Sequence, residues 1–251
     1  ISGHGRPPLK IRGFLNGGFT EIDGLNSQPV SSLLINCAIA ESDSEIRVRH
    51  LHEQPYVKMT MHYLDEQGIK YSERNMEGFR VEGEQSFHAF EKSIPSDFSS
   101  ATFPLCAAAI GPDNDVFLEG LDMSDSQGDK AVVEMLRRMG AEIEIERNGI
   151  RVASAELHGT ELDLNDTPDA LPALAVVGCF AEGETRLTNV AHAKIKETDR
   201  LAAMREELSK MGADIEEADD GLVVRKSALR GALVDGRRDH RVVMALSIAG
   251  M

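Results

Sequence analysis

The stretch Leu208-Ser-Lys-Met-Gly212-Ala-Asp-Ile215 indicates the fold, because the chain carries three versions of it. Leu136-Arg-Arg-Met-Gly140-Ala-Glu-Ile143 is a close match, and Leu64-Asp-Glu-Gln-Gly68-Ile-Lys-Tyr71 follows the same pattern. The three glycines stand at positions 68, 140 and 212, two successive steps of 72 residues. The match continues past the glycine, since Gly149 and Gly221 are also 72 residues apart. A period held over so many positions predicts a repeated architecture.

Each repeat predicts an amphipathic helix that ends at the glycine and leads into a hairpin. Apolar side chains recur at helical spacing before the third glycine, at Leu201, Met204, Leu208 and Met211. Each glycine then stands where a helix end favours positive φ. After Gly140, Ile143 and Ile145 alternate with charged residues, as in a half-buried strand. Asn148-Gly149 then predicts a type I′ hairpin turn, and Asp220-Gly221 takes the same place in the third repeat.

A more uniformly apolar segment precedes each amphipathic helix and predicts a helix that is buried on most of its sides. These segments are residues 30–40, 101–110 and 170–181, and short strand-like stretches follow them at 45–48, 115–118 and 185–187. The repeated unit is therefore βαβαββ, in the α/β (α+β) class. Asp239-His-Arg241, followed by another apolar run, resembles the opening of a fourth unit.

Length and charge limit what kind of protein this is. The 251 residues suit one large or two modest domains. A net charge of −15 argues against binding to nucleic acid or to an anionic membrane surface. The chain has no run of about 18 apolar residues and no signal-peptide pattern, so we expect no membrane association and a cytoplasmic location. It starts with Ile1 and ends in an apolar run, which we interpret as an internal piece of a longer protein.

The cysteines predict packing and not chemistry. Cys37, Cys106 and Cys179 each fall inside the first helix of a repeat, where a small side chain suits a buried position. A disulfide framework or a catalytic thiol is the alternative. The 8 histidines show no His-x3-His spacing and the cysteines no Cys-x2-Cys spacing, so no metal site is predicted.

The most informative polar cluster is Lys196-Glu-Thr-Asp-Arg200, just before the apolar periodicity that begins at Leu201. Lys196 and Arg200 are four residues apart, so we expect both on the same face of the first helical turn. Two cations beside the free N–H groups of a helix start could hold an oxyanion or a phosphate. A solvated charged face without a ligand is the alternative interpretation.

Three further polar clusters also precede apolar helices. The histidine of Asp239-His240-Arg241 could be a titrating acid or base. Asp169 follows Pro168, which suits the first helical position, and would face the Lys196 cluster as a general base. Asn26-Ser27-Gln28 supplies small polar groups that suit a phosphate. Each cluster could be only a surface run or a helix cap, but their shared place in the repeat favours function.

These motifs together resemble the 5-enolpyruvylshikimate-3-phosphate synthase (3-phosphoshikimate 1-carboxyvinyltransferase) family. The resemblance covers the whole chain and rests on motifs in the family's order: Pro7-Pro-Leu9, Ser27-Gln28, Thr167-Pro-Asp169-Ala170, Lys196-Glu-Thr-Asp-Arg200 and Asp239-His-Arg241. It implies the two-domain enolpyruvyl transferase fold, an inside-out α/β barrel with three βαβαββ units in each domain. It also implies an internal fragment that lacks the N- and C-terminal segments. Residues 1–95 would be a partial first domain, on the shikimate 3-phosphate side, and residues 96–251 a partial second domain, with the crossing near 93–97.

The reaction implied by the resemblance moves the enolpyruvyl group of phosphoenolpyruvate to the 5-hydroxyl of shikimate 3-phosphate. The products are 5-enolpyruvylshikimate 3-phosphate and phosphate, in the shikimate pathway of aromatic amino acid biosynthesis. The family uses no metal and no organic cofactor, and we expect a monomer at full length. By position, Asp169 resembles the base and Lys196 its partner near the reacting hydroxyl. Glu197 resembles the proton donor, and His240 a second group near the phosphoenolpyruvate methylene.

The resemblance also implies a set of substrate-binding residues. Arg200 and Arg241 would clamp phosphoenolpyruvate. The shikimate 3-phosphate site would include Asn26, Ser27, Gln28, Tyr56 and His192. His192 replaces a family asparagine, and Glu53 stands where the family has serine, so its carboxylate is expected to repel a phosphate.

Two alternatives to this reaction stay open. UDP-N-acetylglucosamine enolpyruvyl transferase shares the fold but uses a loop cysteine, whereas the cysteines here fall in predicted helices. A non-catalytic repeat or binding module of the same fold would keep the motifs without the reaction. Because the missing segments carry further substrate-binding cations in the family, we expect this piece alone to turn over slowly or not at all.

Overall fold

The computed structural model describes residues 8–112 and 114–251, so Pro7 of the first family motif lies outside the described residues. The chain divides into two compact units, Ile1–Glu91 and Lys92–Met251, and each is described here by itself. This division lies close to the boundary that the sequence predicts between residues 95 and 96. The assignment of these units to the family's two domains stays a prediction.

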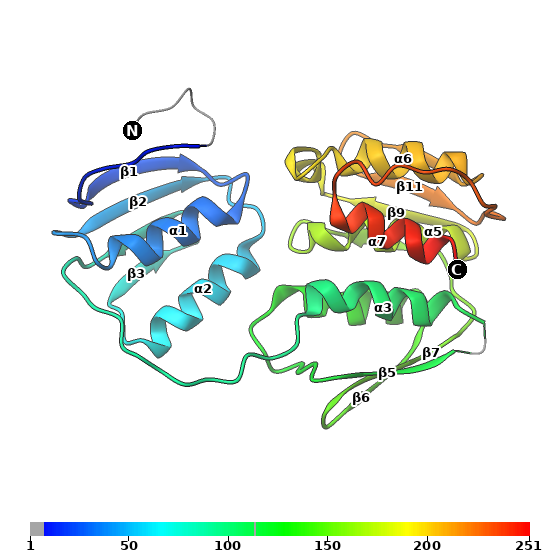
Figure 1. Ribbon diagram of the computed structural model, residues 1–251, viewed down its shortest axis with the longest axis horizontal. Coiled ribbons are helices and arrows are strands. Elements are labelled where there is room, and N and C mark those ends of the chain that lie inside the picture. Colours follow the sequence, from blue (N-terminus) through cyan, green and yellow to red (C-terminus); the bar gives the residue numbers. More distant parts are fainter. Residues whose placement is uncertain (1–7, 113) are drawn as a thin grey trace. The chain divides into compact units, whose positions relative to one another are not determined.

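The described part of the first unit forms one βαβαββ repeat (Figure 1). Its elements are β1 (Gly18–Asp23), α1 (Ser27–Cys37), β2 (Ser44–Arg49), α2 (Gln54–Glu66), β3 (Tyr71–Arg74) and β4 (Gly78–Val81). The strands form a sheet in the order β1-β2-β4-β3. β1 and β2 are parallel, and the other pairs are antiparallel. The predicted repeat is confirmed in this unit.

The second unit contains two further repeats and the helix of the next. The first comprises α3 (Phe98–Ile110), β5 (Asp115–Glu119), the 3-10 turn η1 (Gly128–Lys130), α4 (Ala131–Arg138), β6 (Glu142–Glu146) and β7 (Gly149–Ala153). The second comprises β8 (Glu161–Asp163), the 3-10 turn η2 (Pro168–Ala170), α5 (Leu171–Phe180), β9 (Glu184–Thr188), the 3-10 turn η3 (Ala191–Ile195), α6 (Arg200–Lys210), β10 (Asp214–Glu217) and β11 (Leu222–Arg225). α7 (His240–Ala249) follows.

The strands of the second unit form two sheets, β5-β7-β6 and β10-β11-β9-β8. Only the second has the four strands that the repeat predicts, because the described residues between the start of this unit at Lys92 and α3 form no strand. Together with the sheet of the first unit, the described strands form three separate sheets and no closed barrel.

The core of the second unit is built by the first helix of each repeat. α3, α5 and α7 pack against one another (Figure 1), and every residue of α5 except Phe180 is buried. The prediction of a helix buried on most sides is therefore confirmed for α5. It is wrong for α1 within its own unit, where Val30 and Leu34 are buried but the side of the helix that carries Ile35 is exposed. The reason is that α1 packs only on α2 and its own sheet among the described residues of that unit.

The repeat glycines end their helices as predicted. Gly68, Gly140 and Gly212 have φ values of +69°, +102° and +92°. In each case the next residue donates its N–H to the leucine four positions before the glycine, for example Ala141 to Leu136 at 2.9 Å. The glycine itself donates its N–H to the carbonyl of the residue after that leucine, for example Gly140 to Arg137 at 2.9 Å. The last unpaired carbonyls of the helix are thus satisfied in a Schellman motif.

The hairpin after Gly140 differs from the prediction. β6 and β7 pair with Glu146 opposite Gly149, so the turn residues are Arg147 and Asn148. None of the residues 147–149 has positive φ, which a type I′ turn would require. Gly149 is needed for another reason: a Cβ there would collide with the carbonyl oxygen of Leu118 on β5. The glycine permits close approach of the neighbouring strand, and Gly221 does the same against Leu187 on β9.

The cysteines are free and buried, as the sequence predicts. Burial raises the pKa of the Cys179 thiol to about 12 and raises that of Cys106 as well, so both are held as neutral thiols. Among residues 8–112 and 114–251, no helix combines the length and the hydrophobicity needed to cross a lipid bilayer.

Candidate functional site

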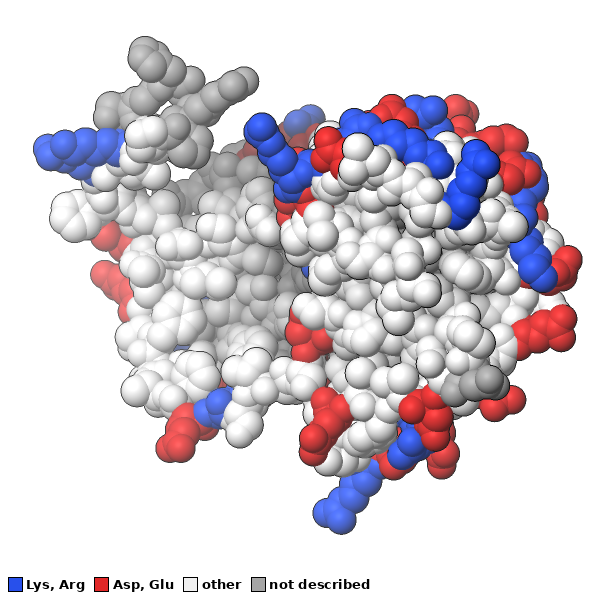
Figure 2. Space-filling model, turned by 45° about the vertical axis from the view of Figure 1, so that its right-hand side comes forward, with Lys and Arg blue, Asp and Glu red and all other residues white. Residues whose placement is uncertain are grey.

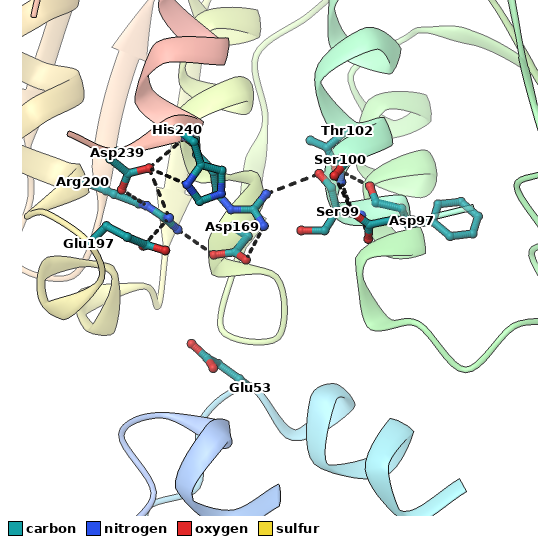
Figure 3. A network of polar contacts seen from close by, with 12 residues as sticks. Glu53, Asp97, Ser99, Ser100, Thr102, Asp169, Glu197, Arg200, Asp239 and His240 are labelled. Atoms are coloured by element: carbon teal, nitrogen blue, oxygen red, sulfur yellow. Dashed lines mark hydrogen bonds and ion pairs between the residues drawn. The ribbon is translucent and has the colours of Figure 1, made fainter. Parts of the chain in front are cut away.

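The polar clusters of the second unit lie at the starts of α5, α6 and α7 (Figure 3). Asp169 lies in the 3-10 turn that leads into α5. Arg200 is the first residue of α6, which Asp199 caps by accepting the N–H of Ala202 at 3.0 Å. Asp239 caps α7 by accepting the N–H of Arg241 at 2.9 Å. The caps of α6 and α7 and the 3-10 turn before α5 thus place Arg200, Asp239 and Asp169 at helix starts.

Arg200 is the centre of this arrangement. Its Nε donates to Asp239 Oδ2 at 2.8 Å, its Nη1 to Asp169 Oδ1 at 2.6 Å and its Nη2 to Glu197 Oε2 at 2.7 Å. The guanidinium is fully buried, and such a buried charge requires partners on each side of its fork. Three carboxylates therefore hold the Arg200 guanidinium through all three of its nitrogen atoms.

The charges of this cluster stabilise one another. Burial acts to lower the pKa of Arg200, but its hydrogen bond to Asp239 and the charges of Asp169 and Asp239 raise the pKa above its ordinary value. Burial acts to raise the pKa of Asp239, and the hydrogen bond and charge of Arg200 overcome it and lower that pKa. Both groups are therefore charged at neutral pH.

Asp169 bridges two guanidinium groups. Its Oδ1 accepts from Arg200, and its Oδ2 lies 2.9 Å from Arg241 Nη2. Arg241 also reaches the carbonyl of Ser99, at the start of α3, with Nη1 at 3.5 Å. The Asp169 carboxylate thus occupies the position between two arginines where an external carboxylate or phosphate could bind.

The other predicted residues of this unit surround the cluster less closely. Lys196 ends η3 before α6 begins, so the prediction that it shares the first helical turn with Arg200 is wrong. The reason is that Asp199 caps the helix, so α6 begins at Arg200, after Lys196. His240 is the first residue of α7, and its exposed ring has Nδ1 3.9 Å from Asp239 Oδ1. His192 lies buried in η3.

The predicted residues of the first unit also lie at helix starts. Asn26 caps α1 by accepting the N–H of Gln28 at 2.8 Å. Ser27 is buried and donates its hydroxyl to Glu53 Oε2 at 2.8 Å. Tyr56 is half-buried in the first turn of α2.

Glu53 is an unusual residue at the start of α2. It is buried, has a left-handed backbone with φ of +57°, and accepts from both the N–H and the hydroxyl of Ser27. Its carboxylate thus occupies donors at the start of α1 that would otherwise be available to an anion.

Sequence reasoning missed two residues of the second unit. The motif around His240 drew attention to the histidine, whereas Asp239 is the buried partner of Arg200. Asp97, which caps α3 through the N–H groups of Ser99 and Ser100, was also missed. The available signal was an aspartate directly before an apolar helix in both cases.

No group of three His, Cys, Asp or Glu side chains within residues 8–112 and 114–251 is arranged to hold a metal ion. On the face drawn in Figure 2, Lys and Arg side chains are interspersed with Asp and Glu. That face offers no broad positive area of the kind that nucleic-acid binding uses.

Solved structures define the class of protein first. The fold is similar to that of the enolpyruvyl transferase NikO from Streptomyces tendae, with a TM-score of 0.69 at 18% identity. It is also similar to EPSP synthase from Acinetobacter baumannii, with a TM-score of 0.75 at 27% identity, covering 94% of this chain and 56% of that one. The chain has the enolpyruvyl transferase fold.

Sequence comparison then defines the family. Residues 1–251 match the family described as EPSP synthase (3-phosphoshikimate 1-carboxyvinyltransferase), and the chain belongs to it. It is 51% identical to the 3-phosphoshikimate 1-carboxyvinyltransferase of Ruminiclostridium cellulolyticum over 249 residues, and 51% identical to that of Acetivibrio thermocellus over 248. These matches cover 99% of this chain but 59% and 58% of the two relatives, so the chain spans less than two thirds of their length.

Proposed function

We propose that this chain is part of an enzyme that transfers the enolpyruvyl group of phosphoenolpyruvate to the 5-hydroxyl of shikimate 3-phosphate. The observation that carries the proposal is the convergence of Asp169, Glu197, Arg200 and Arg241 at adjoining helix starts. Two fixed guanidinium groups suit the carboxylate and phosphate of phosphoenolpyruvate. Of the two carboxyl groups beside them, one can act as base when ionised and the other as acid when protonated. Family membership supports the same substrates.

The addition step needs two proton transfers, one to the methylene carbon of phosphoenolpyruvate and one from the attacking hydroxyl. Glu197, whose side chain is 48% exposed, takes up a proton from solvent and delivers it to the methylene carbon of phosphoenolpyruvate. Asp169 accepts the proton of the attacking hydroxyl, with Lys196 near that hydroxyl. His240 stands near the methylene. Loss of phosphate and of a methyl proton from the tetrahedral intermediate then gives the enolpyruvyl product.

Substrate binding must also change the contacts of Asp169. Its carboxylate is held by both arginines, so a substrate anion that binds them competes with it. Once displaced from one guanidinium, Asp169 regains a free oxygen that can accept a proton. Binding of phosphoenolpyruvate and preparation of the base are therefore linked events in this proposal.

The first unit supplies the shikimate 3-phosphate side. Ser27 and Gln28 at the start of α1, with Asn26 and Tyr56, bind the sugar-like ring and its phosphate. His192, which belongs to the second unit, is proposed separately as a further substrate-binding residue. Phosphate binding requires that Glu53 releases Ser27, which it contacts at 2.8 Å. We also propose that the two units are the two partial domains of a cytoplasmic, monomeric enzyme.

Calorimetric titration with shikimate 3-phosphate and then with phosphoenolpyruvate tests the proposal. We expect saturable binding of shikimate 3-phosphate that Asp169→Ala weakens at least tenfold. Glu53→Ser should strengthen binding, because it restores a hydroxyl donor and removes a competing carboxylate. If the wild type and Glu53→Ser both fail to bind either compound, the non-catalytic binding module becomes the better account.

A further inference from the structure

The segment that leads into α7 lacks regular secondary structure from Lys226 to Asp239. It nevertheless delivers Asp239 and Arg241 to the site within hydrogen-bond distance of their partners. Its last turn contains Arg237 and Arg238, both with left-handed backbone, at φ of +51° and +59°. Residues with a Cβ adopt this conformation at a cost, so the turn requires contacts that hold it.

A buried carboxylate on α6 supplies those contacts. The Glu207 side chain is fully buried, and its Oε2 accepts the N–H of Asp235 at 2.9 Å. Its Oε1 accepts Nε and Nη2 of Arg237 at 2.9 and 2.7 Å. Lys210 completes the set, with Nζ 2.6 Å from Oε2. These cationic and hydrogen-bond partners lower the pKa of Glu207 to about 2 against the effect of burial, so it is a carboxylate at neutral pH.

Glu207 and Arg200 act on the same turn from one helix. They are seven residues apart, which places both on one face of α6 about two turns from each other. Arg200 holds Asp239 at the end of the turn, and Glu207 holds Asp235 and Arg237 at its beginning. The turn is thus fixed at both ends along α6.

We propose that Glu207 is a positioning residue, which through Arg237 and the backbone of Asp235 holds the turn that places Asp239 and Arg241 in the site. Glu207 contacts no group that the proposed function assigns to the chemistry. Its effect on phosphoenolpyruvate binding rests on that proposed function, whereas its effect on the turn does not.

Amide hydrogen exchange measured by NMR, together with phosphoenolpyruvate titration of the same samples, tests this role. The Arg241 N–H, which donates into the Asp239 cap, reports on the turn. In Glu207→Gln, which keeps the shape but loses the charge, we expect this amide to exchange at least tenfold faster. We expect the dissociation constant for phosphoenolpyruvate to rise at least fivefold in that variant.

Lys210→Met is the matched control, because it removes a partner of Glu207 that does not contact the turn. It should leave both measurements within twofold of the wild type. Unchanged exchange of Arg241 in Glu207→Gln, or an equal change in Lys210→Met, overturns the proposal. If Glu207→Gln does not fold, Arg237→Met replaces it in the test. This variant removes the guanidinium that contacts Glu207 and should also make the Arg241 amide exchange faster. Faster exchange in variants of a protein that binds no phosphoenolpyruvate would support the positioning role and contradict the proposed function.

Discussion

At the scale of single residues, the site is defined by the sharing of carboxylates between arginines. Asp169 contacts both Arg200 and Arg241, and it lies 31 residues before the first of them. The sequence predicts that Asp169 faces the Lys196 cluster, because both stand at helix starts. It could not predict that one carboxylate bridges two guanidinium groups, because that depends on how three separate helix ends meet in space.

A substitution of Asp169 should show whether its charge competes with external anions for the two arginines. Asp169→Asn keeps the size of the side chain but removes the negative charge between Arg200 and Arg241. We expect inorganic phosphate to bind about tenfold tighter, equivalent to about 1.4 kcal/mol, because it no longer competes with an internal anion. Calorimetry at low ionic strength measures this change.

The control for that titration is Asp219→Asn, an exposed aspartate in the turn between β10 and β11. It removes the same charge from the unit and should leave phosphate affinity unchanged. Equal or weaker phosphate binding in Asp169→Asn would contradict the competition between Asp169 and external anions.

At the scale of the helix and strand, the repeat accounts for most of what could be predicted. The three glycines end their helices as expected, since a positive φ is a local requirement that glycine meets. The turn before Gly149 was misplaced by one residue, because Asn-Gly is a turn signal and also fits a strand that another backbone approaches closely. Sequence pattern does not separate these two uses of glycine.

The repeat glycines provide a graded test of this distinction. At Gly140, an added Cβ would lie 2.9 Å from the carbonyl oxygen of Glu156, whereas at Gly212 its nearest neighbour is 3.7 Å away. Gly212→Ala should therefore lose about 1–2 kcal/mol of unfolding free energy, from the positive φ alone. Gly140→Ala should lose distinctly more, because the carbonyl must also move.

Urea denaturation followed by circular dichroism gives both unfolding free energies. The two glycines lie in the same unit and share the same cap, so the comparison isolates the close contact. Equal losses in the two variants would show that the Glu156 carbonyl moves without cost.

At the scale of the whole molecule, the sequence predicts a repeated α/β chain of the observed kind. Periodicity and family motifs are sufficient for this. The exposure of Ile35 on α1 could not be predicted, because burial depends on how many helices surround it and not on its own sequence. The ionic contacts of Glu207 could not be predicted either, because in sequence it is one of two adjacent glutamates, Glu206 and Glu207, on a helix with several charged residues.

The second unit should lose stability in acid in a manner that Glu207 controls. Its folded-state pKa lies at about 2, below the ordinary value of 4.5. Its stabilising effect is therefore fully present above about pH 4.5 and is lost as the pH falls toward 2. Asp239, whose pKa is also lowered, contributes in the same direction.

Thermal unfolding measured from pH 7 to pH 2.5 tests this dependence. The melting temperature of the wild type should fall steeply below pH 4.5, and that of Glu207→Gln should start lower and fall less. Glu144→Gln, an exposed change on β6, should follow the wild-type curve. Parallel curves for the wild type and Glu207→Gln would assign the acid sensitivity to other carboxylates.

The seven-residue interval between Arg200 and Glu207 on α6 sets the distance between the two ends of the turn before α7. Deleting one residue between them would rotate one of the two side chains about 100° around the helix axis relative to the other. Adding seven residues would keep both side chains on the same face of α6 but would separate them by about 10 Å more. A substitution within this interval leaves the spacing of the two residues unchanged, whereas an insertion or deletion alters it. Insertions and deletions in the gene should therefore be excluded from this stretch and accumulate in the irregular segment from Lys226 to Val234.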